Sequence, residues 1–426
     1  MNAPEQQRGR HLVQQPSLPG SRGGLFARLR AKASARVFHA ILDKIDQGLV
    51  EGAIEGHLPD GSKRLLGSRR PGPQAIVHIH DWRALTRLVR GGSIGWYEAW
   101  AAGEWSSPDL VPIFDLFMRN RVALGSVGRA SGIAKIAGRM AQWMRRNTPT
   151  HARDNIEAHY DLGNDFYATW LDATMTYSSA IFASLPPGRE TLESAQRRKI
   201  AAVLDRSRLS EGDSLLEIGC GWGGLAEAAL ERAAISYHGI SLSPQQIAFA
   251  EERLAGRSGW TITLTDYRDV VCEYDAIASV EMVEAVGQEY WPAYLDCIAR
   301  CLKPGGRAAL QYIRIEDDIF EQYADGQDFI QRYIFPGGIL LSESRFRALA
   351  EARGLSWEDQ VDFGQHYAET LKMWRQRFEA AVAEGRLPDG FDEKFVALWR
   401  FYLMYCEGGF RGGGINVAQV TLVKSR

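Results

Sequence analysis

Closely spaced glycines directly after an apolar segment are the feature that most constrains what this chain can fold into. Residues 215–218 read LLEI, and the glycines that follow are Gly219, Gly221 and Gly223. Glycine suits a place where the chain turns tightly and brings bare backbone against a ligand, because a Cβ atom would collide there. A helical pattern begins at Leu225. The segment therefore predicts a strand, a ligand-binding loop and a helix, with an ordinary strand-to-helix turn as the alternative.

Composition and charge narrow the class of protein. The 426 residues are 45% apolar and 24% charged, with a formal net charge of −2. At about 150 residues per domain, this length predicts two or three globular domains. The near-neutral charge disfavours nucleic acid as a partner, because no basic field covers the chain.

The cysteines and the lengths of the apolar segments indicate the cellular compartment of the protein. The five cysteines are odd in number and lack C-x-x-C pairs, which argues against a disulfide framework or a zinc site. No apolar run approaches the roughly 18 residues of a membrane-spanning helix. Residues 1–20 also lack the apolar core of a signal peptide. The sequence therefore predicts a cytoplasmic protein without a metal site.

Changes of pattern along the chain predict four regions. Residues 1–35 are expected to form a mobile basic tail, and residues 36–127 a small α+β accessory domain. Residues 128–150 place apolar side chains at helical spacing among only positive charges. They predict a basic amphipathic linker that either lies on an anionic membrane surface or packs between domains. In residues 151–426 strands and helices alternate, which predicts a doubly wound α/β sheet.

Polar residues follow several of the expected strands, where ligands of such a sheet bind. After the second strand, Ser243 and Pro244 predict a helix start, with Gln246 as a capping-box partner. Asp266 and Tyr267 follow the third strand. They offer a hydrogen-bond acceptor and a ring for a nucleotide base, or they form an exposed turn.

Two carboxylates follow the fourth expected strand. Glu281 and Glu284 are three residues apart in an otherwise apolar run. Carboxylates are rarely buried without a partner or a task. The pair therefore predicts a functional site, with an ordinary salt bridge as the alternative.

These motifs and others along the chain resemble the cyclopropane-fatty-acyl-phospholipid synthase family, which includes the mycolic acid cyclopropane synthases and methyltransferases. Further segments that carry the resemblance are residues 159–167 (HYDLGNDFY), 175–180 (MTYSSA), 333–338 (YIFPGG), 363–371 (FGQHYAETL) and 406–411 (CEGGFR). The N-terminal part, with PDG at 59–61, is similar to the accessory domain of the longer bacterial synthases. The resemblance implies a Rossmann-like S-adenosylmethionine (SAM) methyltransferase sheet with helical lipid-pocket insertions.

The resemblance also implies an activity. SAM is the expected cofactor, and its methyl group is expected to go to the cis double bond of a phospholipid acyl chain, giving a cyclopropane or a methyl-branched alkene. The implied cofactor-binding residues are Tyr177, Ser178, Gly219, Gly221, Gly223, Ser241, Leu242, Gln246, Asp266 and Tyr267. Candidate walls of an acyl tunnel, with core packing as the alternative, are Tyr333, Phe335, Trp374, Phe378, Trp399, Phe401, Tyr402 and Tyr405. Peripheral association with an anionic inner-membrane surface and a homodimer are implied as well.

In the family, the base is held to be a bound hydrogen carbonate (bicarbonate) ion, coordinated by a Glu, a His, a Tyr, a Cys and a backbone group. Three positions match, at Glu284, Tyr367 and Cys406, whereas Ser179 stands for a cysteine and Gln311 for the histidine. These five are the predicted catalytic residues. An amide neither carries charge nor relays a proton near neutral pH. Gln311 therefore argues against bound bicarbonate. The hypothesis that follows is an altered anion binding or final deprotonation, which would give an open-chain methyl-alkene in place of a ring; both products stay open at this point.

Two other functions compete with this interpretation. A small-molecule SAM-dependent N- or C-methyltransferase has a similar core but needs no accessory lipid domain, so residues 36–145 favour a lipid substrate. A non-catalytic lipid-binding homologue is the second alternative. The glycine loop and Glu284 argue against it.

Overall fold

The structure is a computed structural model that describes residue 8, residues 38–125 and residues 162–426. The chain divides into two compact units. The first comprises Met1–Met144, Glu321–Ile334 and Gly390–Gly414, and the second comprises Arg145–Phe320, Phe335–Asp389 and Ile415–Arg426. Apart from residue 8, the predicted tail up to residue 35 and the predicted linker at 128–150 lie outside the described residues. The same holds for residues 159–161 of the HYDLGNDFY motif.

The first unit contains a four-stranded sheet among its described residues, in the order β2-β1-β3-β4. Its strands are β1 (Glu51–His57), β2 (Lys63–Gly67), β3 (Arg70–Ile79) and β4 (Trp105–Ser106). Residues 38–48 are helical, and the further helices are α3 (Arg83–Ala101), α4 (Val111–Arg119), α5 (Arg121–Leu124), α14 (Phe329–Tyr333) and α17 (Glu393–Arg411). The predicted turn at 59–61 joins β1 to β2, and the Asp60 carboxylate accepts a hydrogen bond from the Ser62 N–H at 3.0 Å.

Two C-terminal helices belong to this first unit because they pack on its N-terminal helices. α17 lies so close to α4 that a Cβ on Gly408 would be 2.5 Å from the Phe114 Cβ. The ring of Phe401 on α17 lies 5.0 Å from that of Tyr97 on α3 and 4.9 Å from that of Phe329 on α14. The compact units therefore do not coincide with the predicted division at residue 151, since α14 and α17 are grouped with the accessory region.

The second unit is built on a sheet in the order β11-β12-β9-β8-β5-β6-β7, with β10 paired to β9. Its strands are β5 (Ser214–Ile218), β6 (Ser236–Ser241), β7 (Trp260–Leu264), β8 (Tyr274–Val280), β9 (Leu302–Ile315), β10 (Leu341–Ser342), β11 (Leu355–Asp362) and β12 (Ile415–Lys424). β7, β6, β5, β8 and β9 are parallel, and β12 is antiparallel to β9. The strand order reverses between β5 and β8, where open sheets bind ligands.

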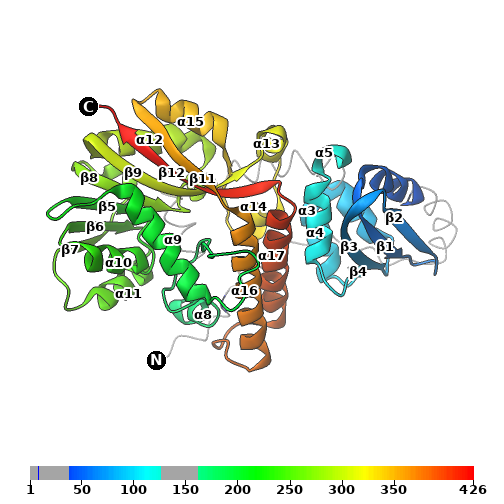
Figure 1. Cartoon of the computed structure of the whole chain (residues 1–426). Helices are drawn as coiled ribbons and strands as arrows, with labels where there is room; N and C mark the ends of the chain where they lie inside the picture. Colours follow the sequence, from blue (N-terminus) through cyan, green and yellow to red (C-terminus); the bar gives the residue numbers. More distant parts are fainter. Residues whose placement is uncertain (1–7, 9–37, 126–161) are drawn as a thin grey trace. The chain divides into compact units, whose positions relative to one another are not determined.

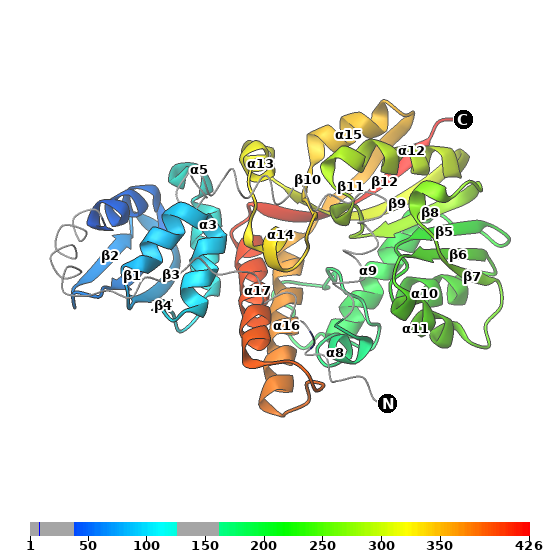
Figure 2. The same cartoon turned by 180° about the vertical axis from the view of Figure 1, so that it is seen from behind.

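Helices cover both faces of this sheet. Figures 1 and 2 show α12 and α15 on one face and α9, α10 and α11 on the other. The helices of this unit are α8 (Asn164–Ala168), α9 (Leu192–Ser207), α10 (Gly224–Arg232), α11 (Pro244–Leu254), α12 (Trp291–Cys301), α15 (Glu343–Glu351) and α16 (Gly364–Ala383). The 3₁₀ turns are η1 (Tyr267–Asp269), η2 (Val283–Ala285) and η3 (Gln288–Tyr290), and α13 (Asp317–Ala324) carries residues of both units. The predicted doubly wound α/β sheet is confirmed.

Apolar side chains on both faces of the parallel strands explain why this layered arrangement is stable. Leu215 on β5 and Ala276 on β8 are buried in one cluster with Val203 on α9 and Leu254 on α11. Successive strand residues point to opposite faces, and the residues that follow these two, Leu216 and Ile277, are buried as well. Strands that are covered on both faces read as continuous apolar runs, as β5 does. Within the part of the chain that the structure describes, no helix combines the length and apolar character needed to span a bilayer.

Candidate active site

The predicted glycine loop lies at the carboxyl end of β5, and its backbone requires glycine. Gly219, Gly221 and Gly223 have φ values of 84°, 51° and 79°, in the left-handed region that side chains disfavour. A Cβ on Gly219 would be 2.8 Å from the Met282 Cγ, whereas nothing lies within 4 Å of a Cβ on Gly221. The loop therefore presents bare backbone to open space at Gly221, as a ligand-binding loop must.

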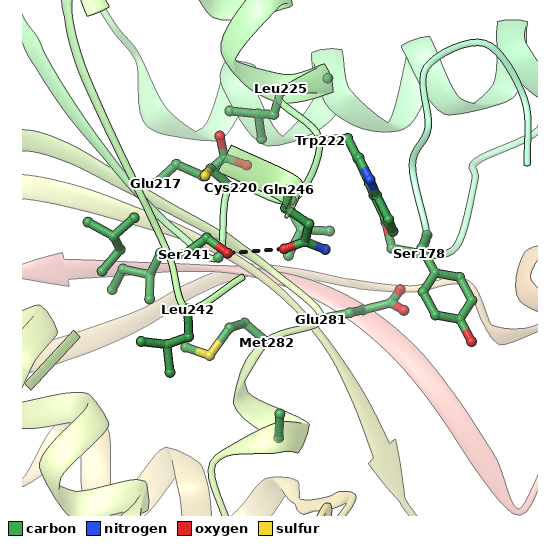
Figure 3. A pocket seen from close by; sticks show the side chains of 18 of the residues that line it. Ser178, Glu217, Cys220, Trp222, Leu225, Ser241, Leu242, Gln246, Glu281 and Met282 are labelled. Carbon is green, nitrogen blue, oxygen red and sulfur yellow. Dashed lines mark hydrogen bonds between the residues drawn. The ribbon is translucent and has the colours of Figure 1, made fainter. Parts of the chain in front are cut away.

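A pocket opens at this loop between the carboxyl ends of β5, β6, β7 and β8, and Figure 3 shows part of its lining. The predicted cofactor-binding residues that line it are Tyr177, Ser178, Gly219, Gly221, Ser241, Leu242, Gln246, Asp266 and Tyr267. Gly223 is the exception. It precedes α10, and a Cβ there would lie 3.0 Å from the Ala250 Cβ. Gly223 therefore serves the packing of α10 on α11, not the lining of the pocket.

The residues after β6 form the predicted helix start with one difference. The Ser243 hydroxyl accepts a hydrogen bond from the Gln246 N–H at 3.3 Å, and Pro244 is the first helical residue. The Gln246 side chain does not complete a capping box. Its Oε1 accepts a hydrogen bond from the Ser241 hydroxyl at 3.0 Å, which Figure 3 shows. Because the carbonyl oxygen is used in this way, the amide NH₂ of Gln246 is left as a donor for a ligand.

Asp266 and Tyr267 follow β7 and begin a short 3₁₀ turn. The Asp266 carboxylate accepts hydrogen bonds from the Arg268 N–H at 2.9 Å and from the Arg268 guanidinium at 2.8 and 2.6 Å. The Tyr267 ring is buried against the Tyr294 ring, with centroids 5.6 Å apart. The turn is thus held rigidly at the pocket wall, and both side chains are ones that suit an adenine base.

Glu281 is the carboxylate at the centre of the predicted catalytic residues. Its Oε1 accepts hydrogen bonds from the Ser179 N–H at 2.9 Å and from the Gln311 amide at 2.7 Å. Its Oε2 accepts a hydrogen bond from the Tyr367 hydroxyl at 2.7 Å. Glu281 also lines the pocket, where Figure 3 shows its carboxylate on the side of Ser178. The structure therefore brings together three of the predicted catalytic residues, but around Glu281 and not around Glu284.

The backbone of Glu281 is strained. Its φ is 49°, a left-handed conformation that glycine adopts freely and other residues adopt rarely. Residues held in such conformations cost about 1–3 kcal/mol each and cluster at functional sites. The strain is consistent with a carboxylate that is required at this point of the chain.

A chain of hydrogen-bond donors fixes the direction of the Gln311 amide. The Arg206 Nε donates to the Gln419 Oε1 at 3.1 Å, and the Gln419 Nε2 donates to the Gln311 Oε1 at 3.0 Å. A guanidinium only donates hydrogen bonds, so both amides are oriented with their NH₂ groups away from Arg206. The Gln311 NH₂ therefore faces Glu281, which favours the ionised carboxylate.

Opposing effects set the pKa of Glu281. Burial raises this pKa above its usual value, and the Ser179 N–H, the Lys199 ammonium and the Gln311 amide act against that shift. Hydrogen bonds to a carboxylate stabilise its charge, whereas removal from water destabilises it. A carboxylate with a raised pKa is a stronger base than an exposed one, so Glu281 has the properties of a general base.

Glu284 has different contacts. Its Oε1 accepts a hydrogen bond from the Ile313 N–H, and among the described residues its Oε2 has no hydrogen-bond partner. Burial first, and the charge of Glu281 second, raise the pKa of Glu284 to about 8. Cys406 lies on α17 in the first unit, where burial raises the pKa of its thiol above the usual range. The catalytic roles of Glu284 and Cys406 stay predictions.

Replacing Glu284 by glutamine should change how stability depends on pH. Because the folded-state pKa is raised from 4.5 to about 8, the stabilisation from the neutral carboxyl is fully present below about pH 4.5 and is lost as the pH rises through 8. Glutamine does not titrate. We therefore expect the Tm of the variant, relative to wild type, to rise between pH 5 and pH 8 in thermal melts. A Tm difference that is the same at both pH values would contradict the raised pKa.

Three residues of the site were missed by sequence reasoning. The sequence marks Glu281 only as one of two neighbouring carboxylates, and the resemblance assigns the catalytic role to Glu284. Gln419 lies on β12 opposite Gln311, a pairing that no local pattern reveals. Lys199 is 1% exposed at the pocket, and its place among the buried residues of α9, such as Ile200 and Val203, was the one available signal.

The strand order, the glycine loop after β5 and the polar residues at the neighbouring strand ends form a nucleotide-type binding site of an open sheet, and similarity to known proteins identifies the class as SAM-dependent methyltransferases. The family model described as mycolic acid cyclopropane synthetase matches residues 147–420. The chain belongs to this family, which confirms the resemblance found in the sequence.

Known relatives agree with this assignment. Tuberculostearic acid methyltransferase of Mycobacterium tuberculosis is 39% identical over 372 residues, with 83% of each chain covered. Cyclopropane-fatty-acyl-phospholipid synthase of Escherichia coli is 33% identical over 346 residues, covering 81% of this chain and 87% of that protein. A solved structure of a mycolic acid cyclopropane synthase, complexed with S-adenosylhomocysteine (SAH) and CTAB, is also similar. Its TM-score is 0.59 and its sequence identity 30%, and the match covers 64% of this chain and 98% of the other.

SAM is the cofactor of this protein, and the pocket residues fit it. The open space at Gly221 admits a ligand against bare backbone, and the Gln246 amide and the Tyr267 ring offer contacts for a ribose and a base. Bound SAM supplies an electrophilic methyl group, and Glu281 is a carboxylate with a raised pKa that lines the same pocket.

Proposed function

We propose that this protein transfers the SAM methyl group to the cis double bond of an unsaturated fatty-acyl chain in a membrane phospholipid and releases a methyl-branched alkene. The acyl substrate is supported by the relatives, whose names describe a fatty-acyl-phospholipid synthase and a tuberculostearic acid methyltransferase. The observation that carries the open-chain product is the position of the Glu281 carboxylate.

Hydrogen carbonate does not fit this site. Three of the groups that the resemblance assigns to the anion are the backbone N–H of Ser179, the side chain at position 311 and the Tyr367 hydroxyl. All three already donate hydrogen bonds to Glu281. We infer that the Glu281 carboxylate takes the place of the anion, so that the base is part of the chain.

The chemistry needs one proton acceptor. Attack of the alkene electrons on the methyl group of bound SAM would break the sulfur–methyl bond, release S-adenosylhomocysteine and leave a carbocation on the acyl chain. A hydride shift from the neighbouring carbon would then move that charge. Loss of a proton from the next chain carbon to the Glu281 carboxylate then forms a new double bond, and the carboxyl later gives the proton to water. Glu281 is a suitable acceptor because burial raises its pKa and because three hydrogen bonds hold it in one orientation.

Product identification tests the proposed function. The protein is expressed in a host with unsaturated phospholipids, and the lipids are compared with those of a host carrying an empty vector. A ring and a methyl-branched alkene add the same mass, so NMR must distinguish them. We expect a new methyl branch with olefinic protons retained. Cyclopropane protons with loss of the alkene would contradict the open-chain product, and unchanged lipids would contradict the acyl substrate.

A phospholipid substrate requires the protein to work at a membrane surface. We propose peripheral association with an anionic inner-membrane surface, supported by the positive charges at 128–150. We also propose a homodimer, which the resemblance to the longer bacterial synthases implies. Flotation of the protein with anionic and with neutral vesicles tests the membrane association. Light scattering, which measures the mass of the particle in solution, tests the homodimer. Equal flotation with both vesicle types would contradict the role of charge.

A further inference from the structure

Lys199 is a buried cation that the proposed mechanism does not use. It lies on α9, is 1% exposed and lines the pocket that contains the glycine loop. Burial lowers the pKa of Lys199 to about 8, while the nearby carboxylates, with Glu281 first, act in the opposite direction. Lysine is almost never fully buried unless it is paired with another group. The position of Lys199 therefore needs an explanation.

The hydrogen bond between Lys199 and Ser178 fixes the direction of the serine hydroxyl. The Lys199 Nζ donates to the Ser178 Oγ at 2.5 Å. An ammonium has three donors and no acceptor, so the Ser178 oxygen must accept, and its own proton points elsewhere. The Gln196 amide donates to the Ser178 carbonyl at 2.8 Å and holds the backbone. The Ser178 hydroxyl, which also lines the pocket, is thus a donor toward a ligand.

The charges of the pocket lining indicate which ligand group these donors meet. SAM carries a single carboxylate, on its methionine part. Two cationic side chains line the pocket among the described residues, and one of them, Arg268, already pairs with Asp266 at 2.6 Å. Among the residues that the structure describes, the Lys199 ammonium donates one hydrogen bond, to Ser178, so its other donors can serve an anion.

We propose that Lys199 and Ser178 form the subsite for the carboxylate of SAM, with Lys199 supplying the countercharge and orienting the Ser178 hydroxyl as a second donor. This assignment rests on the SAM cofactor and is independent of the acyl substrate. Because it concerns the carboxylate alone, a ligand that lacks this group is the matched probe.

Calorimetric titration of the full chain with two ligands tests the subsite. One is S-adenosylhomocysteine (SAH), and the other is its decarboxylated analogue S-adenosyl-3-thiopropylamine, which keeps the amine. We expect Lys199→Met to lower the affinity for SAH about 10- to 100-fold and to change the affinity for the analogue less than about twofold. Ser178→Ala should act in the same direction, and this smaller change serves if Lys199→Met fails to fold. Lys372→Met, at a 40% exposed side chain of the same unit, is the control and should bind like wild type.

Two results would overturn the proposal. If both ligands lose affinity equally, Lys199 shapes the pocket without recognising the carboxylate. If SAH binds to both variants as it binds to wild type, the carboxylate lies elsewhere. Neither result depends on the identity of the lipid product, so failure of this subsite is distinguishable from failure of the proposed function.

Discussion

Replacing Glu281 by glutamine is expected to lower turnover by about 10²- to 10⁴-fold, the range of a lost general base, while SAH still binds. Glutamine has nearly the same shape as glutamate, and its amide oxygen can still accept a hydrogen bond from the Ser179 N–H or the Gln311 amide. It removes only the basic oxygen that receives the proton. Single-turnover assays with unsaturated phospholipid vesicles measure the rate, and calorimetry measures SAH binding.

A matched control is available at the opposite end of β8. Glu273 is an exposed carboxylate just before β8, and Glu273→Gln should keep the wild-type rate. Turnover of Glu281→Gln within a few-fold of wild type would remove Glu281 from the role of base. A loss of SAH binding would instead show that the change had altered the cofactor site.

Replacing Glu281 by glycine is expected to produce an enzyme that depends on an added anion. Glycine suits the φ of 49° at this position, so the backbone should fold as before. The Ser179 N–H, the Gln311 amide and the Tyr367 hydroxyl, which donate to Glu281 in the wild type, would then face a space that a small carboxylate can enter. We expect turnover of about 10²-fold or more below wild type, with at least a tenfold recovery (about 1.4 kcal/mol) on addition of hydrogen carbonate or formate.

Glu281→Gln is the matched control for this rescue, because its side chain fills the space that the anion needs. Assays over a range of anion concentrations at constant ionic strength provide the measurement. Failure of every small carboxylate to restore turnover would contradict the placement of Glu281 in the anion's position. Equal recovery in both variants would contradict it as well, because the effect would then arise elsewhere.

The parts of the site that depend on local pattern were predictable from the sequence. The loop at Gly219 and Gly221 follows from the need for positive φ and close approach, and the start of α11 follows from Ser243 and Pro244. The doubly wound sheet follows from alternating strands and helices. Each of these inferences uses residues that are near one another in the chain, so no knowledge of packing was required.

The choice between Glu281 and Glu284 could not be made in this way. β8 ends at Val280, and Glu281 then turns into the left-handed region, so neither the strand period nor the helix period applies. Which carboxylate meets Gln311 depends on the register of β9 against β8 and β12, including the pair of Gln419 with Gln311. Similarly, the packing of α17 on α4 joins distant segments, which the predicted boundary at residue 151 did not anticipate.

The most direct test of the central claim is the response of the wild-type enzyme to hydrogen carbonate. Turnover on unsaturated phospholipid vesicles is measured in buffer freed of carbon dioxide, with and without added hydrogen carbonate. Because Glu281 supplies the base from within the chain, the account predicts the same rate in both conditions. A rate that falls in the depleted buffer and returns with the added anion would contradict it.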